Sequence, residues 1–145
     1  MSTKELQEKL VANMERWQKV EDTAVKTTED IANKTNNPVV KHVMKIIKRD
    51  SEMHKLTQQL IIDTLQGTYT MTPDELADVW GSIEKHIETE LQTIELAKEA
   101  KAYLKDKKMT VQEYLVEYLL VDEEKHNALL EQLATIKKGM YPYGS

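Results

Sequence analysis

A set of acidic and histidine residues in this sequence has the types and spacings needed to bind a metal ion. The seven candidates are Glu21, Asp50, His54, His86, Glu90, Glu123 and His126. Residues three or four positions apart, such as Glu123 and His126, share one face of a helix. Charged groups are costly inside a protein unless they are paired or bind a metal. Because imidazole suits iron or zinc and carboxylate suits iron or manganese, the set is a candidate divalent-metal site.

Four segments with helical periodicity must position these side chains. We predict helices over about residues 3–34, 38–65, 73–104 and 110–139. Asn37 and Pro38 suit the cap and first turn of the second helix. Capping boxes are predicted at 72–75 and 110–113, with a weak point at Gly81 and a cap at Gly139.

The inward stripe of each predicted helix carries at least one carboxylate. In the second helix, the inward residues are expected to be Val43, Ile47, Asp50, His54, Thr57 and Ile61. In the fourth helix, Leu119 is expected inside together with Glu123 and His126. At a rise of about 1.5 Å per residue, the acidic groups fall within roughly one to two helical turns of one level.

The fold class that follows is all-α. No segment has the alternating pattern of a strand. Helices joined by short turns pack antiparallel to their neighbours. We therefore predict an antiparallel four-helix bundle, with residues 1–139 as a single domain and 140–145 as a flexible tail.

Composition narrows the classes of partner. A net charge of -5 argues against a nucleic-acid-binding protein, which needs a clustered basic surface. A basic helix face formed by Lys41, Lys45, Lys48 and Arg49 is more simply explained as a solvated surface than as a phosphate site. The sequence has no cysteine, no apolar signal core and no apolar run that could span a bilayer. We expect a soluble, cytoplasmic protein with no membrane partner.

The segment 119–126, followed by Leu129 and Leu130, resembles the last-helix motif of the ferritin-like superfamily, particularly the rubrerythrin type. This resemblance implies a ferritin-like bundle in which two helices each supply one glutamate and two others supply a glutamate with a histidine three residues later. Glu21 and Glu90 match the single glutamates, and Glu123 with His126 matches one pair. In the other pair His54 is present, but Ser51 stands where the glutamate belongs.

The resemblance also implies a cofactor and an activity. Two iron ions and an oxidase or peroxidase reaction with dioxygen or peroxide would be expected, with manganese or zinc as alternative metals. An external electron donor would be needed, since no cysteine is present to build a rubredoxin domain. Because Ser51 replaces a bridging ligand, a mononuclear site and a site without metal are alternatives. The mononuclear site would use His54, Glu90, Glu123 and His126.

A non-enzymatic function is the alternative to an oxidase or peroxidase. Asp50 with His54, and Asp122 with His126, have the spacing of simple intrahelical pairs. The polar layer would then be structural, and the bundle would bind a partner or self-associate as a homodimer. Tyr118 and the segment 141–143 are candidate contacts for that purpose.

Overall fold

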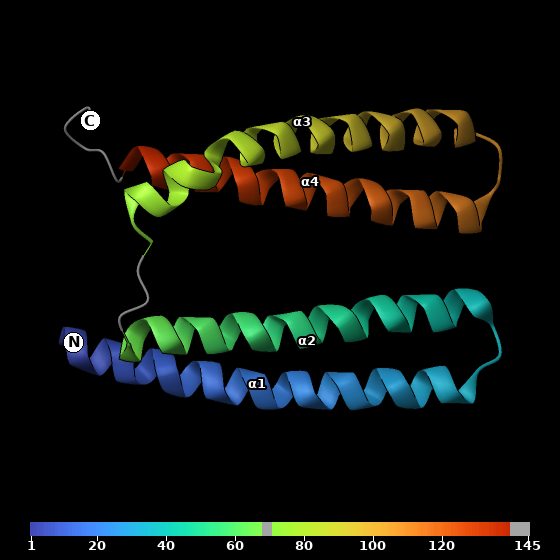
Figure 1. The fold of residues 1–145 in the computed structure, drawn as a ribbon. Helices are drawn as coiled ribbons and strands as arrows, with labels where there is room; N and C mark the ends of the chain where they lie inside the picture. The colour runs from blue at the N-terminus through green and yellow to red at the C-terminus, as the bar shows by residue number, and fades with distance from the viewer. Residues whose placement is uncertain (68–70, 140–145) are drawn as a thin grey trace. The chain divides into compact units, whose positions relative to one another are not determined.

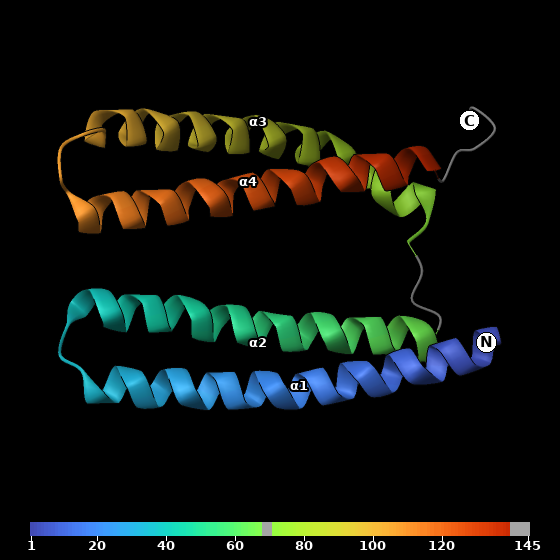
Figure 2. The same ribbon diagram turned by 180° about the vertical axis from the view of Figure 1, so that it is seen from behind.

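The computed structural model describes residues 1–67 and 71–139 as four helices and no strand, which confirms the all-α prediction. The helices are α1 (Thr3–Lys34), α2 (Pro38–Gln66), α3 (Pro73–Leu104) and α4 (Thr110–Gly139). The chain divides into two units, Met1–Thr70 and Met71–Ser145, each of which is described by itself. We call them the N-terminal hairpin, in which α1 packs against α2, and the C-terminal hairpin, in which α3 packs against α4 (Figures 1 and 2).

Side-chain caps explain where three of the helices begin. The hydroxyl of Ser2 accepts a hydrogen bond from the Glu5 amide at 3.1 Å at the start of α1. The side-chain oxygen of Asn37 accepts hydrogen bonds from two amides in the first turn of α2, and Pro38 is the first residue of that helix. Thr72 accepts from the amide of Glu75 at 3.3 Å, so the predicted cap of α3 is confirmed.

The start of α4 differs from the prediction. Thr110 is already the first helical residue, and the Glu113 amide donates to the main-chain oxygen of Met109 at 2.9 Å. The predicted capping box at Thr110 is therefore wrong. The preceding turn reverses through left-handed backbone at Asp106 (φ 61°) and Lys108 (φ 54°). α3 runs through Gly81 as a continuous helix, so no break occurs at the predicted weak point.

Few side chains are buried in either hairpin. In the C-terminal hairpin, Ile94, Ala97 and Leu120 form one apolar cluster. In α2 the buried residues are Ser51, Gln58 and Ile62, and the neighbouring Thr57 is exposed.

The stripes predicted to face inward in α2 and α4 differ in part from the faces that pack within the hairpins. Ile47 and Leu119 are 41% and 51% exposed, whereas Leu120 is buried. At Ser51 in α2 and Leu120 in α4, the packed face lies about 100° around the helix from the expected stripe, which is the rotation of one residue. The reason is that each helix buries mainly the face turned toward its own hairpin partner.

No helix in the described ranges is long and apolar enough to cross a membrane. The predicted tail, 140–145, with its candidate contact segment 141–143, lies outside the described residues.

Candidate metal centre

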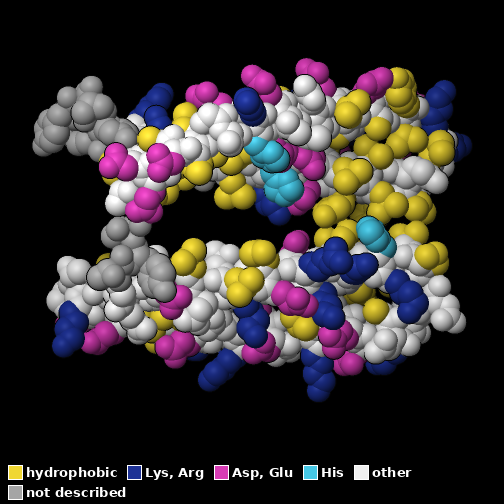
Figure 3. Space-filling view, viewed as in Figure 1, with side chains coloured by type: hydrophobic (Ala, Val, Ile, Leu, Met, Phe, Trp, Pro, Cys, Tyr) yellow, Lys and Arg dark blue, Asp and Glu magenta, His cyan; other side chains and the backbone are white. Residues whose placement is uncertain are grey.

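The C-terminal hairpin brings together three of the predicted site residues. Glu90 of α3 and Glu123 with His126 of α4 each offer a ligand atom, and these atoms lie within 4.8 Å of one another. Glu90 is 6% exposed, although it carries a carboxylate. On this hairpin the histidines lie beside acidic side chains in the space-filling view (Figure 3). Glu123 and His126, which are three residues apart on α4, thus lie close to the Glu90 carboxylate of the facing helix α3.

The distances between these groups suit one cation. His126 Nδ1 lies 3.7 Å from Glu90 Oε1 and 3.8 Å from Glu123 Oε2. Metal bonds of about 2.1 Å at angles of about 90–110° would put neighbouring donors roughly 3.0–3.4 Å apart. These two donor pairs therefore need to close by roughly 0.3–0.8 Å to bind one ion. Two oxygens and an imidazole nitrogen form a donor set that iron, manganese and zinc accept.

Neighbouring side chains hold these groups in place. His86 Nε2 lies 2.9 Å from Glu90 Oε1, one turn away on α3. Asp122 Oδ2 lies 3.3 Å from His126 Nε2, which leaves Nδ1 facing the two glutamates. The predicted intrahelical pair of Asp122 with His126 is thus confirmed. Such a carboxylate behind a histidine fixes the orientation of the ring.

Two carboxyl groups this close repel each other when both are charged. A hydrogen bond with Glu90 raises the pKa of Glu123, and the same bond lowers the pKa of Glu90. Burial of Glu90 acts to raise its pKa, whereas His86 and His126 act to lower it further. Among the described residues, no donor reaches Glu90 Oε2 unless the two carboxyl groups share a proton. A divalent cation would replace that proton, so the residues fit a metal.

The opposite pKa shifts of Glu123 and Glu90 predict a pH dependence of stability for the metal-free protein. Because the pKa of Glu123 is raised on folding, its stabilising contribution is full below the ordinary glutamate pKa and is lost as pH rises through the raised value. The pKa of Glu90 is lowered, so its contribution is present above the ordinary value and is lost as pH falls. With chelator present, Glu123→Gln is expected to gain stability relative to wild type as pH rises from about 4 toward neutral.

The measurement is urea unfolding of both proteins across this pH range. Glu124→Gln, an exposed neighbour on α4, is the matched control and should follow wild type throughout. If the curve for Glu123→Gln runs parallel to that of wild type, the shared proton is not present.

The N-terminal hairpin contains a poorer version of the same arrangement. Glu21 is 8% exposed, accepts a hydrogen bond from Trp17 Nε1 at 3.2 Å and lies 3.5 Å from His54 Nδ1. Ser51 is buried on α2, whereas Asp50 is exposed and forms no ion pair with His54 in the described part of the chain. Ser51 occupies the face of α2 that packs against α1, so Asp50 lies off that face, and its inward position in a four-helix bundle stays a prediction.

The two hairpins place these groups in matching register. Ser51 and His54 lie 13 and 16 residues after Pro38, and Glu123 and His126 lie 13 and 16 residues after Thr110. Glu21 and Glu90 lie on the opposing helices α1 and α3. The position that carries the second carboxylate in the C-terminal hairpin therefore carries a hydroxyl in the N-terminal one.

Two residues at these sites were not among the predicted ones. Thr93 contacts Glu123 across the hairpin, and its position three residues after Glu90 was the available signal. Gln58 is 3% exposed, with its side-chain oxygen unpartnered among the described residues. It lies seven residues after Ser51, on the same face of α2.

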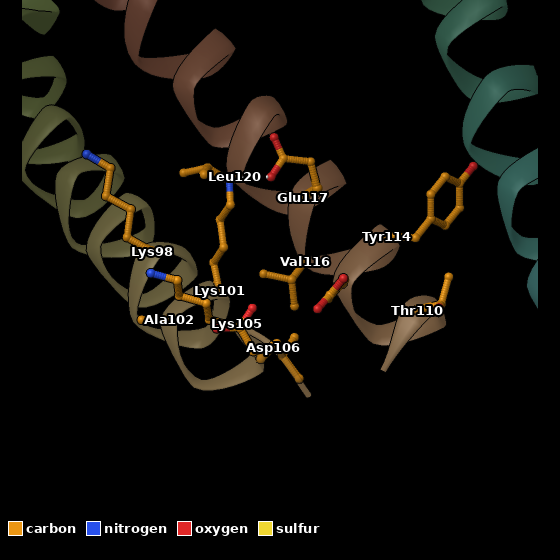
Figure 4. Close-up of a pocket in the computed structure, with 12 residues that line it drawn as sticks. Lys98, Lys101, Ala102, Lys105, Asp106, Thr110, Tyr114, Val116, Glu117 and Leu120 are labelled. Carbon is orange, nitrogen blue, oxygen red and sulfur yellow. Dashed lines mark ion pairs between the residues drawn. The ribbon is translucent and has the colours of Figure 1, made fainter. Parts of the chain in front are cut away.

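A cavity of about 910 Å³ lies at the turn between α3 and α4 but does not include the candidate ligands. Figure 4 shows its walls, where Lys101 and Glu117 form an ion pair of 2.9 Å. Acidic and basic side chains line it together, so it has no charge preference that would indicate an anionic or cationic ligand. The carboxylate and histidine cluster is therefore the better candidate for chemistry.

The fold and the site together define a class: an all-α protein of two helical hairpins, one of which carries a carboxylate and histidine cluster suited to a divalent metal. Comparison of the chain with protein-family models, with curated proteins and with solved structures finds no match.

Proposed function

We propose that this protein is a ferritin-like metal-binding protein whose metal centre lies in the C-terminal hairpin. Glu90, Glu123 and His126 are the proposed ligands, and iron is the proposed metal, with manganese or zinc as alternatives. The observation that carries the proposal is the convergence of the three ligand atoms within 4.8 Å around a buried carboxylate. The resemblance of residues 119–126 to the rubrerythrin-type motif supports it.

The roles of the surrounding residues follow from their contacts. Glu90 and Glu123 would contribute negatively charged oxygen ligands, and His126 would contribute a ring nitrogen. Asp122 orients the His126 ring. Bound iron would supply electron transfer to an oxidant such as dioxygen or peroxide. An external electron donor would then complete the reaction of an oxidase or peroxidase.

We also propose that the two hairpins pack as one antiparallel four-helix bundle over residues 1–139, as the resemblance implies. Each hairpin leaves large apolar side chains exposed, among them Leu56, Leu60, Leu119 and Leu129. Two helices alone bury too little apolar surface for a stable fold, so further packing is required. In such a bundle Glu21 and His54 would add to the polar layer.

A structural polar layer is the second candidate. It is favoured by the pairing of His86 with Glu90 and of His126 with Asp122, which gives both histidines a carboxylate partner without a metal. The protein would then be a non-enzymatic module that binds a partner or forms a homodimer.

Metal analysis separates the two candidates. Wild-type protein titrated with Fe²⁺ under anaerobic conditions is expected to bind about one ion per chain at the proposed centre. The double variant Glu123→Ala, His126→Ala should lose at least about 100-fold in affinity, because two of three ligands are gone. Glu124→Ala is the matched control, as its side chain lies on the exposed face of α4. No binding by folded wild-type protein would leave the structural layer as the function.

A further inference from the structure

Thr93 connects the two glutamates of the proposed centre. Its hydroxyl oxygen lies 2.8 Å from Glu123 Oε2 on α4 and 2.7 Å from the main-chain oxygen of Glu90 on its own helix. The side chain is partly buried between α3 and α4. Thr93 is thus in contact with a proposed ligand without being a ligand itself.

The single hydroxyl proton defines what this contact can do. A threonine hydroxyl has one hydrogen to donate and two lone pairs that accept. A ligating glutamate is ionised and can only accept, so Glu123 competes with the Glu90 main-chain oxygen for the single proton of Thr93. A hydrogen bond to an ionised acceptor is about twice as strong as one between neutral groups. The bond therefore holds Glu123 in a fixed orientation in the state that binds metal.

The N-terminal hairpin offers an internal comparison. The residue three positions after Glu21 is Ala24, just as Thr93 is three positions after Glu90. The facing residue there is Ser51, which has no carboxylate to orient. The hydroxyl thus occurs in the hairpin that has a second glutamate, and a methyl group occurs in the one that lacks it.

We propose that Thr93 is a positioning residue that orients the Glu123 carboxylate toward a bound divalent cation. This inference rests on the proposed function, since it concerns the same centre. Residues that hold a metal ligand in place commonly contribute 10- to 100-fold to affinity, and roughly this loss is expected without the hydroxyl.

The test compares Thr93→Val, which keeps the shape and loses the hydroxyl, with Thr93→Ser, which keeps the hydroxyl. Binding of Mn²⁺ alone to the full chain is measured by calorimetry, and the helical content of each variant is checked by circular dichroism. Thr93→Val should bind about 10- to 100-fold more weakly than wild type, and Thr93→Ser within about threefold of it. Thr89→Val, one turn earlier on an exposed site, is the control and should bind as wild type does.

Two results would overturn the role of Thr93 while leaving the centre intact. One is wild-type affinity in Thr93→Val. The other is an equal loss in Thr93→Val and Thr93→Ser, because Thr93→Ser keeps the hydroxyl and should therefore keep the affinity. Absence of Mn²⁺ binding in the wild-type chain would instead overturn the centre, and the role of Thr93 with it.

Discussion

Ser51→Glu is expected to raise the metal stoichiometry of the chain from about one ion to about two. The substitution places a carboxylate three residues before His54, at the register that Glu123 holds in the C-terminal hairpin. Glu21 already lies 3.5 Å from His54. The N-terminal hairpin would then hold the same donor set of two carboxylates and one imidazole.

The same substitution is expected to destabilise the metal-free protein. Ser51 is 6% exposed, and a new carboxylate there would be buried beside Glu21 without a cation. An uncompensated buried charge costs on the order of 3–5 kcal/mol. Urea unfolding with chelator should show this loss, and added Mn²⁺ should recover most of it.

Ser51→Gln is the matched control, because it introduces the same shape without the charge. It should bind no additional metal and should gain no stability from Mn²⁺ beyond that of wild type. A Ser51→Glu protein that folds but still binds about one ion would contradict the equivalence of the two hairpins.

Leu120→Ala is expected to lower the free energy of unfolding by about 2–5 kcal/mol. Leu120 is 7% exposed and forms the apolar cluster with Ile94 and Ala97. Truncation removes buried methyl groups and leaves a cavity between α3 and α4. Leu119→Ala removes the same atoms from a side chain that is 51% exposed, so its loss should stay below about 1 kcal/mol.

Tryptophan fluorescence extends this experiment to the proposed bundle. The two tryptophans are Trp17 on α1 and Trp80 on α3, so single-tryptophan proteins report each hairpin separately. In one cooperative bundle, Leu120→Ala should shift both unfolding curves equally. A shift seen only by Trp80 would mean that the hairpins unfold independently and would contradict the bundle.

The helices could be predicted closely from the sequence because their ends are specified locally. Asn37 with Pro38 and Thr72 with Pro73 satisfy first-turn amides with their own side chains, so their positions need no tertiary information. Thr110 showed the limit of this reasoning. It has the sequence of a cap but is already helical, because a main-chain bond to Met109 starts the helix one residue earlier.

The candidate site was predicted only in part. Glu123 and His126 follow from spacing on one helix, but their contact with Glu90, 33 and 36 residues away in sequence, depends on the register between α3 and α4. The sequence predicts Asp50 inward because it lies one turn before His54 on the same stripe, whereas the face of α2 that packs against α1 passes through Ser51. Thr93 was missed because a threonine on a helix most often bonds to its own backbone, and only the fold brings Glu123 to it.

The connections within the hairpins have a kinetic consequence. α1 and α2 are joined by Thr35 to Asn37, and α3 and α4 by Lys105 to Met109, so packed helices are also neighbours in sequence. Loops this short close on a timescale of roughly 10–100 ns, and helical proteins rich in local contacts fold in about microseconds to milliseconds. The two helices of each hairpin can therefore meet soon after the second one is synthesised, and the stable fold then depends on the further packing that each hairpin needs.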